Sequence, residues 1–271
     1  MHINPDFTYT ATDSKTRLLY VHRKLPAQDI YWVNSRSNSV EDVDAVFRVS
    51  GKAVEIWHPE TGMMELASYS FANGLTKVPL HLQPNDAVFV IFNKNTSVTS
   101  FTAPQPKETP LTIVEGGWNI SFQKDRGAPA EITVSKLASW TDNTDAGVKY
   151  FSGTGTYTKT ITAPAGWFTN KAQLWIDLGD VKNLAEVTVN GKLLGIVWKK
   201  PFRVNAAGAL KPGDNTLVIK VTNLWVNRLI GDQQPGVEKK ITYTTMPFYQ
   251  AGSPLLPSGL LGPVQVVSVT K

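Results

Sequence analysis

The chain has 271 residues, of which 42% are hydrophobic and 18% charged, and it contains no cysteine. This length is sufficient for one large or two ordinary domains, and the lack of cysteine excludes a disulfide scaffold, a Cys-ligated zinc site and a thiol nucleophile. The formal net charge is +5, and the basic residues occur singly or in pairs along the chain. A nucleic-acid-binding protein usually carries a dense basic stripe, so we expect no nucleic-acid partner.

Strand signals dominate the first hundred residues. Runs of β-forming residues are separated by turn residues at the spacing typical of a β-sandwich. The expected strands are 29–34, 43–50, 53–58, 64–69, 75–82 and 87–92. Gly51 takes a positive φ at little cost, so we expect a tight hairpin between 43–50 and 53–58.

A domain boundary is expected in a proline-rich stretch. Pro104, Pro106 and Pro110 fall within seven residues, and proline cannot continue a strand ladder. We therefore divide the chain into a domain of residues 1–105 and a domain of residues 106–271.

The second part again shows strand signals, and no window of a dozen residues keeps a helical period. Asn190-Gly191 is a strong signal for a type I′ hairpin. The expected strands are 118–122, 155–161, 173–178, 186–190, 192–195, 217–222, 240–245 and 264–269. We predict an all-β protein of two β-sandwich domains, the first immunoglobulin-like and the second a galactose-binding-like jelly roll.

The hydrophobic runs are too short for a membrane partner to be expected. The longest, residues 87–92, falls far short of the ~20 residues that span a bilayer. No signal peptide opens this chain.

No catalytic signature stands out. A glycosidase needs two carboxyl groups ~5–10 Å apart, and the nearest acidic cluster is Asp142 with Asp145. These residues are interpreted as a hydrogen-bonded loop or helix cap, with a structural calcium site as the alternative. We expect no other cofactor. The four histidines have no matching nucleophile signature and all lie in the first segment: His2, His22, His58 and His81.

Tryptophan and polar residues point to carbohydrate, because sugars stack their C–H faces on flat rings and bond their hydroxyl groups to polar side chains. Segment 222–232 combines both kinds of residue at the end of a strand. The candidate carbohydrate-binding residues are Trp140, Asn223, Trp225, Asn227, Arg228 and Asp232. The alternative is that Trp225 packs in the core while Asn227 and Arg228 brace a loop.

The other tryptophans are sorted by their surroundings. Trp118, Trp175 and Trp198 lie in strand-like sequence and are expected in the core or half-buried. Trp140, Trp167 and Trp225 adjoin loops, so we expect them nearer the surface.

Several segments together resemble known families. The second part is similar to the sugar-binding jelly roll of family 2 glycoside hydrolases, in residues 140–142, 150–157, 185–192 and 198–202. Residues 217–232, with 19–23, 29–34 and 53–62 in the first part, resemble α-L-rhamnosidase-like enzymes of glycoside hydrolase family 106.

The resemblance implies a C-terminal, non-catalytic region, because the acid and base of such enzymes lie in an upstream α/β barrel and no barrel pattern occurs here. It further implies a secreted or periplasmic protein whose partners are that catalytic barrel domain and an oligo- or polysaccharide. It also implies that loops 223–232 and 245–257 approach the substrate pocket.

Three functions remain open on the sequence. The first is an accessory region that supports the barrel and binds carbohydrate, and the second is a purely structural module without a sugar site. The third is a self-sufficient glycosidase, which would need two acids converging in one pocket.

Overall fold

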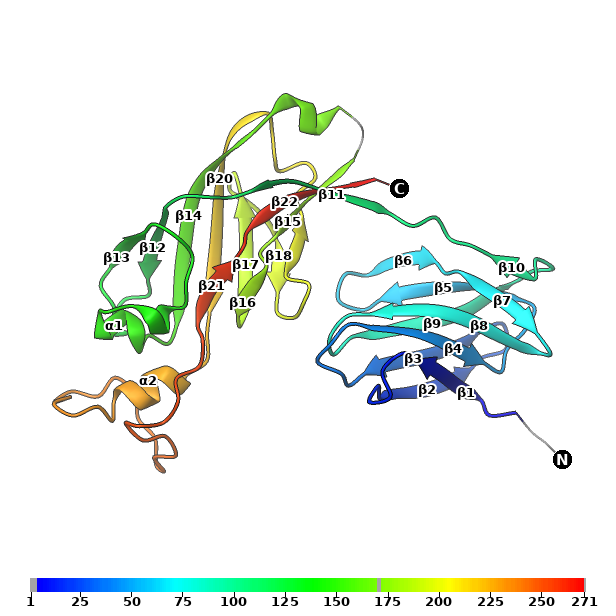
Figure 1. Ribbon diagram of the computed structural model, residues 1–271, viewed down its shortest axis with the longest axis horizontal. Coiled ribbons are helices and arrows are strands. Elements are labelled where there is room, and N and C mark those ends of the chain that lie inside the picture. Colours follow the sequence, from blue (N-terminus) through cyan, green and yellow to red (C-terminus); the bar gives the residue numbers. More distant parts are fainter. Residues whose placement is uncertain (1–3, 170–171, 271) are drawn as a thin grey trace. The chain divides into compact units, whose positions relative to one another are not determined.

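The computed structural model describes residues 4–169 and 172–270. The protein is all-β, as predicted, and its sheets form two β-sandwiches (Figure 1). The chain divides into two compact units, residues 1–105 (unit 1) and 106–271 (unit 2). His2 lies outside the described residues. The immunoglobulin-like and jelly-roll subtypes stay predictions.

Unit 1 consists of two five-stranded antiparallel sheets that lie face to face. The first sheet has the order β1 (Phe7–Ala11), β4 (Glu41–Phe47), β8 (Leu75–Leu82), β7 (Tyr69–Ala72) and β10 (Ser100–Phe101). The second has the order β2 (Leu18–Lys24), β3 (Asp29–Ser35), β9 (Ala87–Asn95), β5 (Lys52–His58) and β6 (Met63–Leu66).

Along the strands of unit 1, successive side chains point to opposite faces of the sheet. Every second residue is therefore buried in the core. Aromatic rings from both sheets meet there. The Phe47 ring lies 4.8 Å from the Tyr31 ring and 5.4 Å from the Phe92 ring.

The predicted hairpin at Gly51 is wrong. Gly51 has a positive φ of 70°, as expected, but β4 pairs with β1 and β8 whereas β5 pairs with β6 and β9. The turn therefore carries the chain from one sheet to the other. Local sequence fixes the bend but not the sheet that the next strand joins.

Unit 2 is built on a six-stranded sheet that packs against a four-stranded one, with a short two-stranded ladder beside them. The large sheet has the order β13 (Glu131–Val134), β12 (Trp118–Phe122), β14 (Thr154–Ala163), β20 (Gly213–Thr222), β17 (Leu184–Val189) and β18 (Lys192–Val197). The second has the order β11 (Lys107–Ile113), β22 (Gln265–Thr270), β15 (Gln173–Asp177) and β19 (Arg203–Asn205), and the ladder joins β16 (Asp180–Lys182) to β21 (Gly259–Gly262).

The hairpin between β17 and β18 is confirmed. Asn190 and Gly191 have φ values of 51° and 80°, and a type I′ turn requires positive φ at both central positions. Here the signal is entirely local, so the sequence was enough to find it.

Helices are short in the described residues, and none is long and apolar enough to cross a membrane. They are η1 (Trp140–Asp142), α1 (Ala146–Lys149), η2 (Ala165–Phe168) and α2 (Val226–Gly231).

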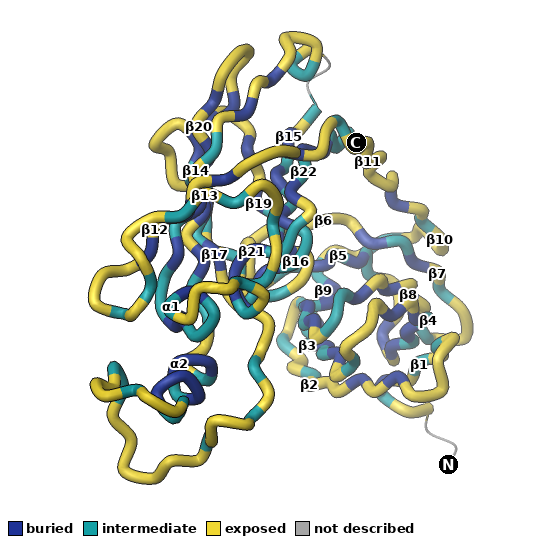
Figure 2. Tube along the Cα trace, turned by 60° about the vertical axis from the view of Figure 1, so that its left-hand side comes forward, coloured by how far each residue is buried: buried dark blue, intermediate teal, exposed yellow. Residues whose placement is uncertain are grey.

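The strand expected at 240–245 is absent, so that prediction is wrong. The segment belongs to a long loop after α2 that is mostly exposed (Figure 2). Its amides are bound by a side chain instead of a strand ladder, because Ile241 and Thr242 donate to Asp232.

Candidate functional site

The end of β20 and the start of α2 hold most of the residues predicted to bind carbohydrate. Asn223 accepts a hydrogen bond from the Gly153 N–H at 2.9 Å and donates to the Phe151 carbonyl at 2.8 Å. The buried Ser152 hydroxyl donates to the Leu224 carbonyl at 2.9 Å and accepts from the Arg228 N–H at 3.1 Å. Asn223 and Ser152 therefore fasten the β20–α2 junction to the segment before β14.

Asn227 fastens the far end of the long loop. Its side chain donates to the Leu256 carbonyl at 2.7 Å and accepts from the Leu256 N–H at 2.9 Å. The amide group thus takes both backbone hydrogen bonds of one residue, as a neighbouring strand would. Asn227 is buried, so it closes the loop by contacts within the chain.

Arg228 and Asp232 form a buried ion pair, with 3.1 Å between Nε and Oδ1. The other carboxylate oxygen of Asp232 accepts hydrogen bonds from Ile241 and Thr242. Burial opposes ionisation of Asp232, but the hydrogen bonds from Thr242 and Ile241 and the charge of Arg228 together hold its pKa below the ordinary value. The carboxylate is a charged anchor for the loop.

The predicted polar residues are thus brought together, but they are engaged with the chain itself. Asn227 and Arg228 brace the loop, as the alternative interpretation had it, and Asp232 braces it as well. Trp225 is not in the core, because it is 48% exposed. Its ring lies 4.7 Å from the guanidinium carbon of Arg126, which stacks on one of its faces.

Beyond α2, the braced loop carries apolar side chains into solvent. Tyr243 is 89% and Phe248 81% exposed. We use the name loop surface for the exposed residues Leu224, Trp225, Tyr243, Met246, Phe248 and Leu256. Sequence reasoning selected 245–257 only through the family resemblance and missed Tyr243. The signal that could have identified Tyr243 is its place as a hydrophobic residue in a segment rich in turn residues.

Trp140 lies elsewhere, and the expectation that it is near the surface is wrong. It is buried among Phe122, Phe151 and Tyr157, with ring centroids 5.3–6.3 Å apart. Its backbone N–H donates to Ser258 in the segment before β21, so the 3-10 turn places the ring in the core. A hollow beside it of about 100 Å³ is smaller than the ~300 Å³ at which ligand pockets begin.

Other tryptophans differ in part from expectation. Trp118 is buried and Trp175 is half-buried, as predicted, and Trp167 is also half-buried. Trp198 is exposed, so its predicted burial is wrong. It follows β18, at the edge of the large sheet, where one side of the strand has no neighbour to cover it.

Of the acidic pair Asp142 and Asp145, Asp145 serves as a helix cap. The Asp145 carboxylate accepts a hydrogen bond from the Val148 N–H at 3.1 Å at the start of α1, which is the loop-and-cap interpretation. Across the part of the chain that the structure describes, no group of three or more His, Asp or Glu residues is placed to hold a metal ion.

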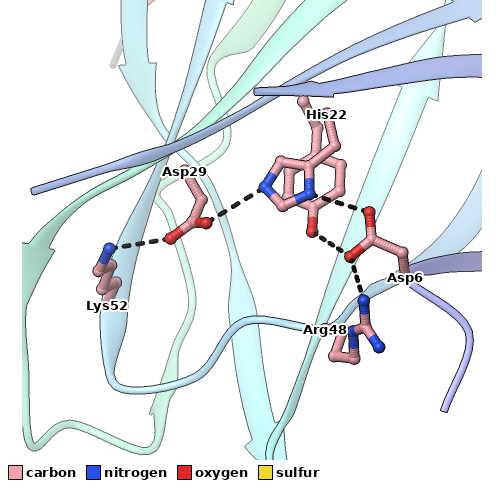
Figure 3. Close-up of polar contacts among 6 residues, drawn as sticks. Asp6, His22, Asp29, Arg48 and Lys52 are labelled. Carbon is pink, nitrogen blue, oxygen red and sulfur yellow. Dashed lines mark hydrogen bonds and ion pairs between the residues drawn. The ribbon is translucent and has the colours of Figure 1, made fainter. Parts of the chain in front are cut away.

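A separate cluster of titratable residues lies in unit 1 (Figure 3). His22 is bound between two carboxylates, with Nδ1 2.9 Å from Asp6 and Nε2 3.1 Å from Asp29. Lys52 lies 2.9 Å from Asp29, and Arg48 lies 3.3 Å from Asp6. Sequence reasoning missed this cluster, because no spacing motif joins its members.

Within the cluster, the surroundings shift the pKa values of Asp29 and Tyr31. Burial opposes ionisation of Asp29, but Lys52 and His22 keep its pKa below the ordinary value. Burial and the nearby Asp6 raise the pKa of Tyr31, whose ring stacks on His22 at 3.9 Å. Asp29 is therefore held as a carboxylate and is not poised to protonate a glycosidic oxygen. Through His22 and Arg48, Asp6 ties the segment before β1 to the rest of unit 1.

Comparisons with known proteins cover almost the whole chain. Residues 1–71 match the family model described as alpha-L-rhamnosidase, of glycoside hydrolase family 106. The solved structure of a rhamnosidase from Novosphingobium sp. PP1Y is 44% identical in sequence and superposes with a TM-score of 0.90. It matches 98% of this chain.

A second relative is a protein of Formosa agariphila provisionally named a beta-glucuronidase. It is 34% identical over 193 residues, which are 63% of this chain. The chain spans 25% of the rhamnosidase and 16% of the Formosa protein. The resemblance inferred from the sequence is confirmed: this chain is similar to one part of an α-L-rhamnosidase-like glycoside hydrolase of family 106.

Proposed function

We propose that the chain is an accessory, non-catalytic region of a secreted or periplasmic rhamnosidase-like glycoside hydrolase, and that it supports a catalytic barrel in the same polypeptide. The loop surface carries this proposal. An ordered loop that exposes Tyr243, Met246 and Phe248 to water is unfavourable in an isolated domain. It becomes favourable when the same side chains are buried against a neighbouring domain.

The way the loop is held supports the same function. Asn227 and Asp232 are buried, and hydrogen bonds between their side chains and the backbone fix the loop at residues 256 and 241–242. A loop ordered before contact loses less conformational entropy when its surface is covered. The buried acid of this part of unit 2, Asp232, is occupied in that bracing, which is consistent with a supporting role.

Substitution of the loop surface tests the proposal. Replacing Tyr243, Met246 and Phe248 together by Ser is expected to leave the thermal midpoint of the isolated chain unchanged, because these side chains are exposed. In the full-length polypeptide the same change is expected to lower the thermal midpoint and rhamnosidase activity. Trp198→Ser is the matched control, since it removes an exposed aromatic elsewhere in unit 2. Full activity and stability of the triple variant would contradict the proposal.

Carbohydrate binding at Trp225 is a second candidate function. Arg126 stacks on one face of the exposed Trp225 ring, and a sugar could stack on what remains uncovered. The test is retention on oligosaccharide arrays, which Trp225→Ala should abolish and Trp198→Ala should not. No retention of the unmodified chain would leave only the structural role.

A further inference from the structure

The outer face of the second sheet of unit 1 carries a continuous apolar row. Strand register places Val21 opposite Trp32, Trp32 opposite Phe89, Phe89 opposite Trp57, and Trp57 opposite Met64. These five residues, here called the aromatic row, take one position from each strand of the sheet. On the three central strands, buried core residues adjoin the row, as Val33, Ile56, Val88 and Val90 show, so the row lies on the face that points away from the core.

Burial on this face confirms that the side chains cover one another. Ile91 is only 1% exposed, yet it is not among the residues that pack between the two sheets. It pairs with Ile30 and Glu55, next to the aromatic row. An isoleucine that is buried on the outer side of a sheet means that a layer of hydrophobic side chains already lies there.

The edges of the layer remain open. Val21 on β2 is 61% exposed and Met64 on β6 is 64% exposed, and Leu19 and Leu66 on the same two strands are also exposed. Soluble domains seldom leave a hydrophobic stripe across an entire sheet in water, and an exposed apolar edge strand favours aggregation unless it is covered.

The other sheet of unit 1 shows what a solvent-facing side looks like in this protein. Its outer face carries an ion pair between Lys77 and Asp44 at 2.8 Å and a second between His81 and Asp42 at 2.7 Å. The contrast between the two faces of one sandwich shows that the apolar row is specific to the second sheet.

The Glu55 carboxylate, which lies beside the aromatic row, is already paired. Glu55 accepts hydrogen bonds from Trp57 Nε1 at 3.0 Å and from Asn93 at 3.1 Å, and Lys94 lies 3.4 Å away. A covering surface would therefore not need to supply a partner for this carboxylate, whereas the buried Oδ1 of Asn93 has none within the part of the chain that the structure describes. A sugar, in contrast, needs free hydrogen-bonding side chains beside the ring, so this arrangement favours an apolar protein surface.

We propose that the aromatic row is a docking surface for an apolar protein surface in the remainder of the rhamnosidase-like polypeptide. The inference rests on the proposed accessory function. The similar rhamnosidase matches 98% of this chain but has only 25% of its own length in the match, so three quarters of such a protein is available to supply the covering surface. Tryptophan, phenylalanine and methionine are the apolar residues enriched at protein interfaces.

Hydrogen exchange tests the inference directly. In the full-length polypeptide, backbone amides of β2 and β6 are expected to exchange about tenfold or more slowly than in the isolated chain. The double substitution Val21→Glu and Met64→Glu should remove this difference while leaving the thermal midpoint of the isolated chain unchanged. Val98→Glu, at an exposed valine between β9 and β10, should retain it.

Three outcomes would overturn the inference. Equal exchange in the isolated and full-length proteins would show that nothing covers the row. A dimer of the isolated chain that dissociates in the double variant would identify a second copy as the occupant, and polysaccharide binding lost in that variant would identify a sugar. If the double variant unfolds, equal exchange in the unmodified proteins still refutes the docking. Hydrolysis by the isolated chain would refute the accessory function separately.

Discussion

Arg228 on α2 and Asp232, the residue that follows the helix, form an ion pair at 3.1 Å that is almost entirely shielded from water. The pair links the helix to the loop that follows, because Asp232 also binds the amides of residues 241 and 242. Its contribution is to order the loop surface.

Asp232→Asn is expected to destabilise unit 2 by about 3 kcal/mol, because it leaves Arg228 as an uncompensated buried charge. Urea unfolding measures this, and limited proteolysis should show faster cleavage within 233–257. The control is Asp214→Asn, which alters an exposed hydrogen bond to Thr162 and should cost less than about 1 kcal/mol. Equal costs for the two changes would refute the anchoring role of Asp232.

The stabilising effect of Asp232 should depend on pH. Because its folded-state pKa lies below the ordinary value of 3.8, the carboxylate contributes stability above that pH. The contribution is lost as the pH falls through the folded-state pKa. The difference in unfolding free energy between the unmodified chain and Asp232→Asn should thus be constant from pH 5 to 7 and shrink below pH 3.8. A constant difference down to acid pH would contradict this assignment.

Trp140 and Trp225 should respond in opposite ways to truncation. Trp140→Ala removes a buried ring from the core of unit 2 and is expected to cost about 3–5 kcal/mol in unfolding free energy. Trp225→Ala removes an exposed ring and should cost less than about 1 kcal/mol. Urea denaturation of the two variants compares them directly. A mild effect of Trp140→Ala would mean that this tryptophan is not a core residue.

His22→Phe should destabilise unit 1 although the aromatic stack on Tyr31 is retained. The change removes the group that lies between Asp6 and Asp29, leaving each carboxylate with one fewer partner, and we expect a cost of about 1–3 kcal/mol. His81→Phe, at an exposed ion pair with Asp42, is the control and should have little effect. Thermal unfolding of the two variants compares their stabilities. Equal thermal midpoints would show that His22 contributes no more than a surface contact.

Much of the fold was predictable because the signals are local. The β-class follows from alternating runs, and the β17–β18 turn follows from Asn190-Gly191. The prediction of a hairpin at Gly51 was wrong because the sequence indicates a bend but not which sheet the following strand joins. The strand expected at 240–245 is absent because the side chain of Asp232, at the end of α2, binds the amides of residues 241 and 242, a contact that the strand propensity of the segment does not reveal.

The site was predictable only in part. Residues 223–232 were identified as an organised group, but their roles depend on contacts with Phe151, Ser152 and Leu256 that no spacing reveals. The burial of Trp140 likewise depends on residues 258–259. The aromatic row arises from pairing among five strands. The sequence indicates the aromatic row only through Trp32 and Trp57, which alternate with core residues and therefore face away from the core.

The central claim is that this region supports hydrolysis without performing it. The most direct measurement is the release of chromophore from an aryl α-L-rhamnoside by the purified chain, beside the full-length polypeptide at equal molar concentration. We expect no release by the chain alone and rapid release by the full-length protein. Turnover by the chain alone at a comparable rate would contradict it.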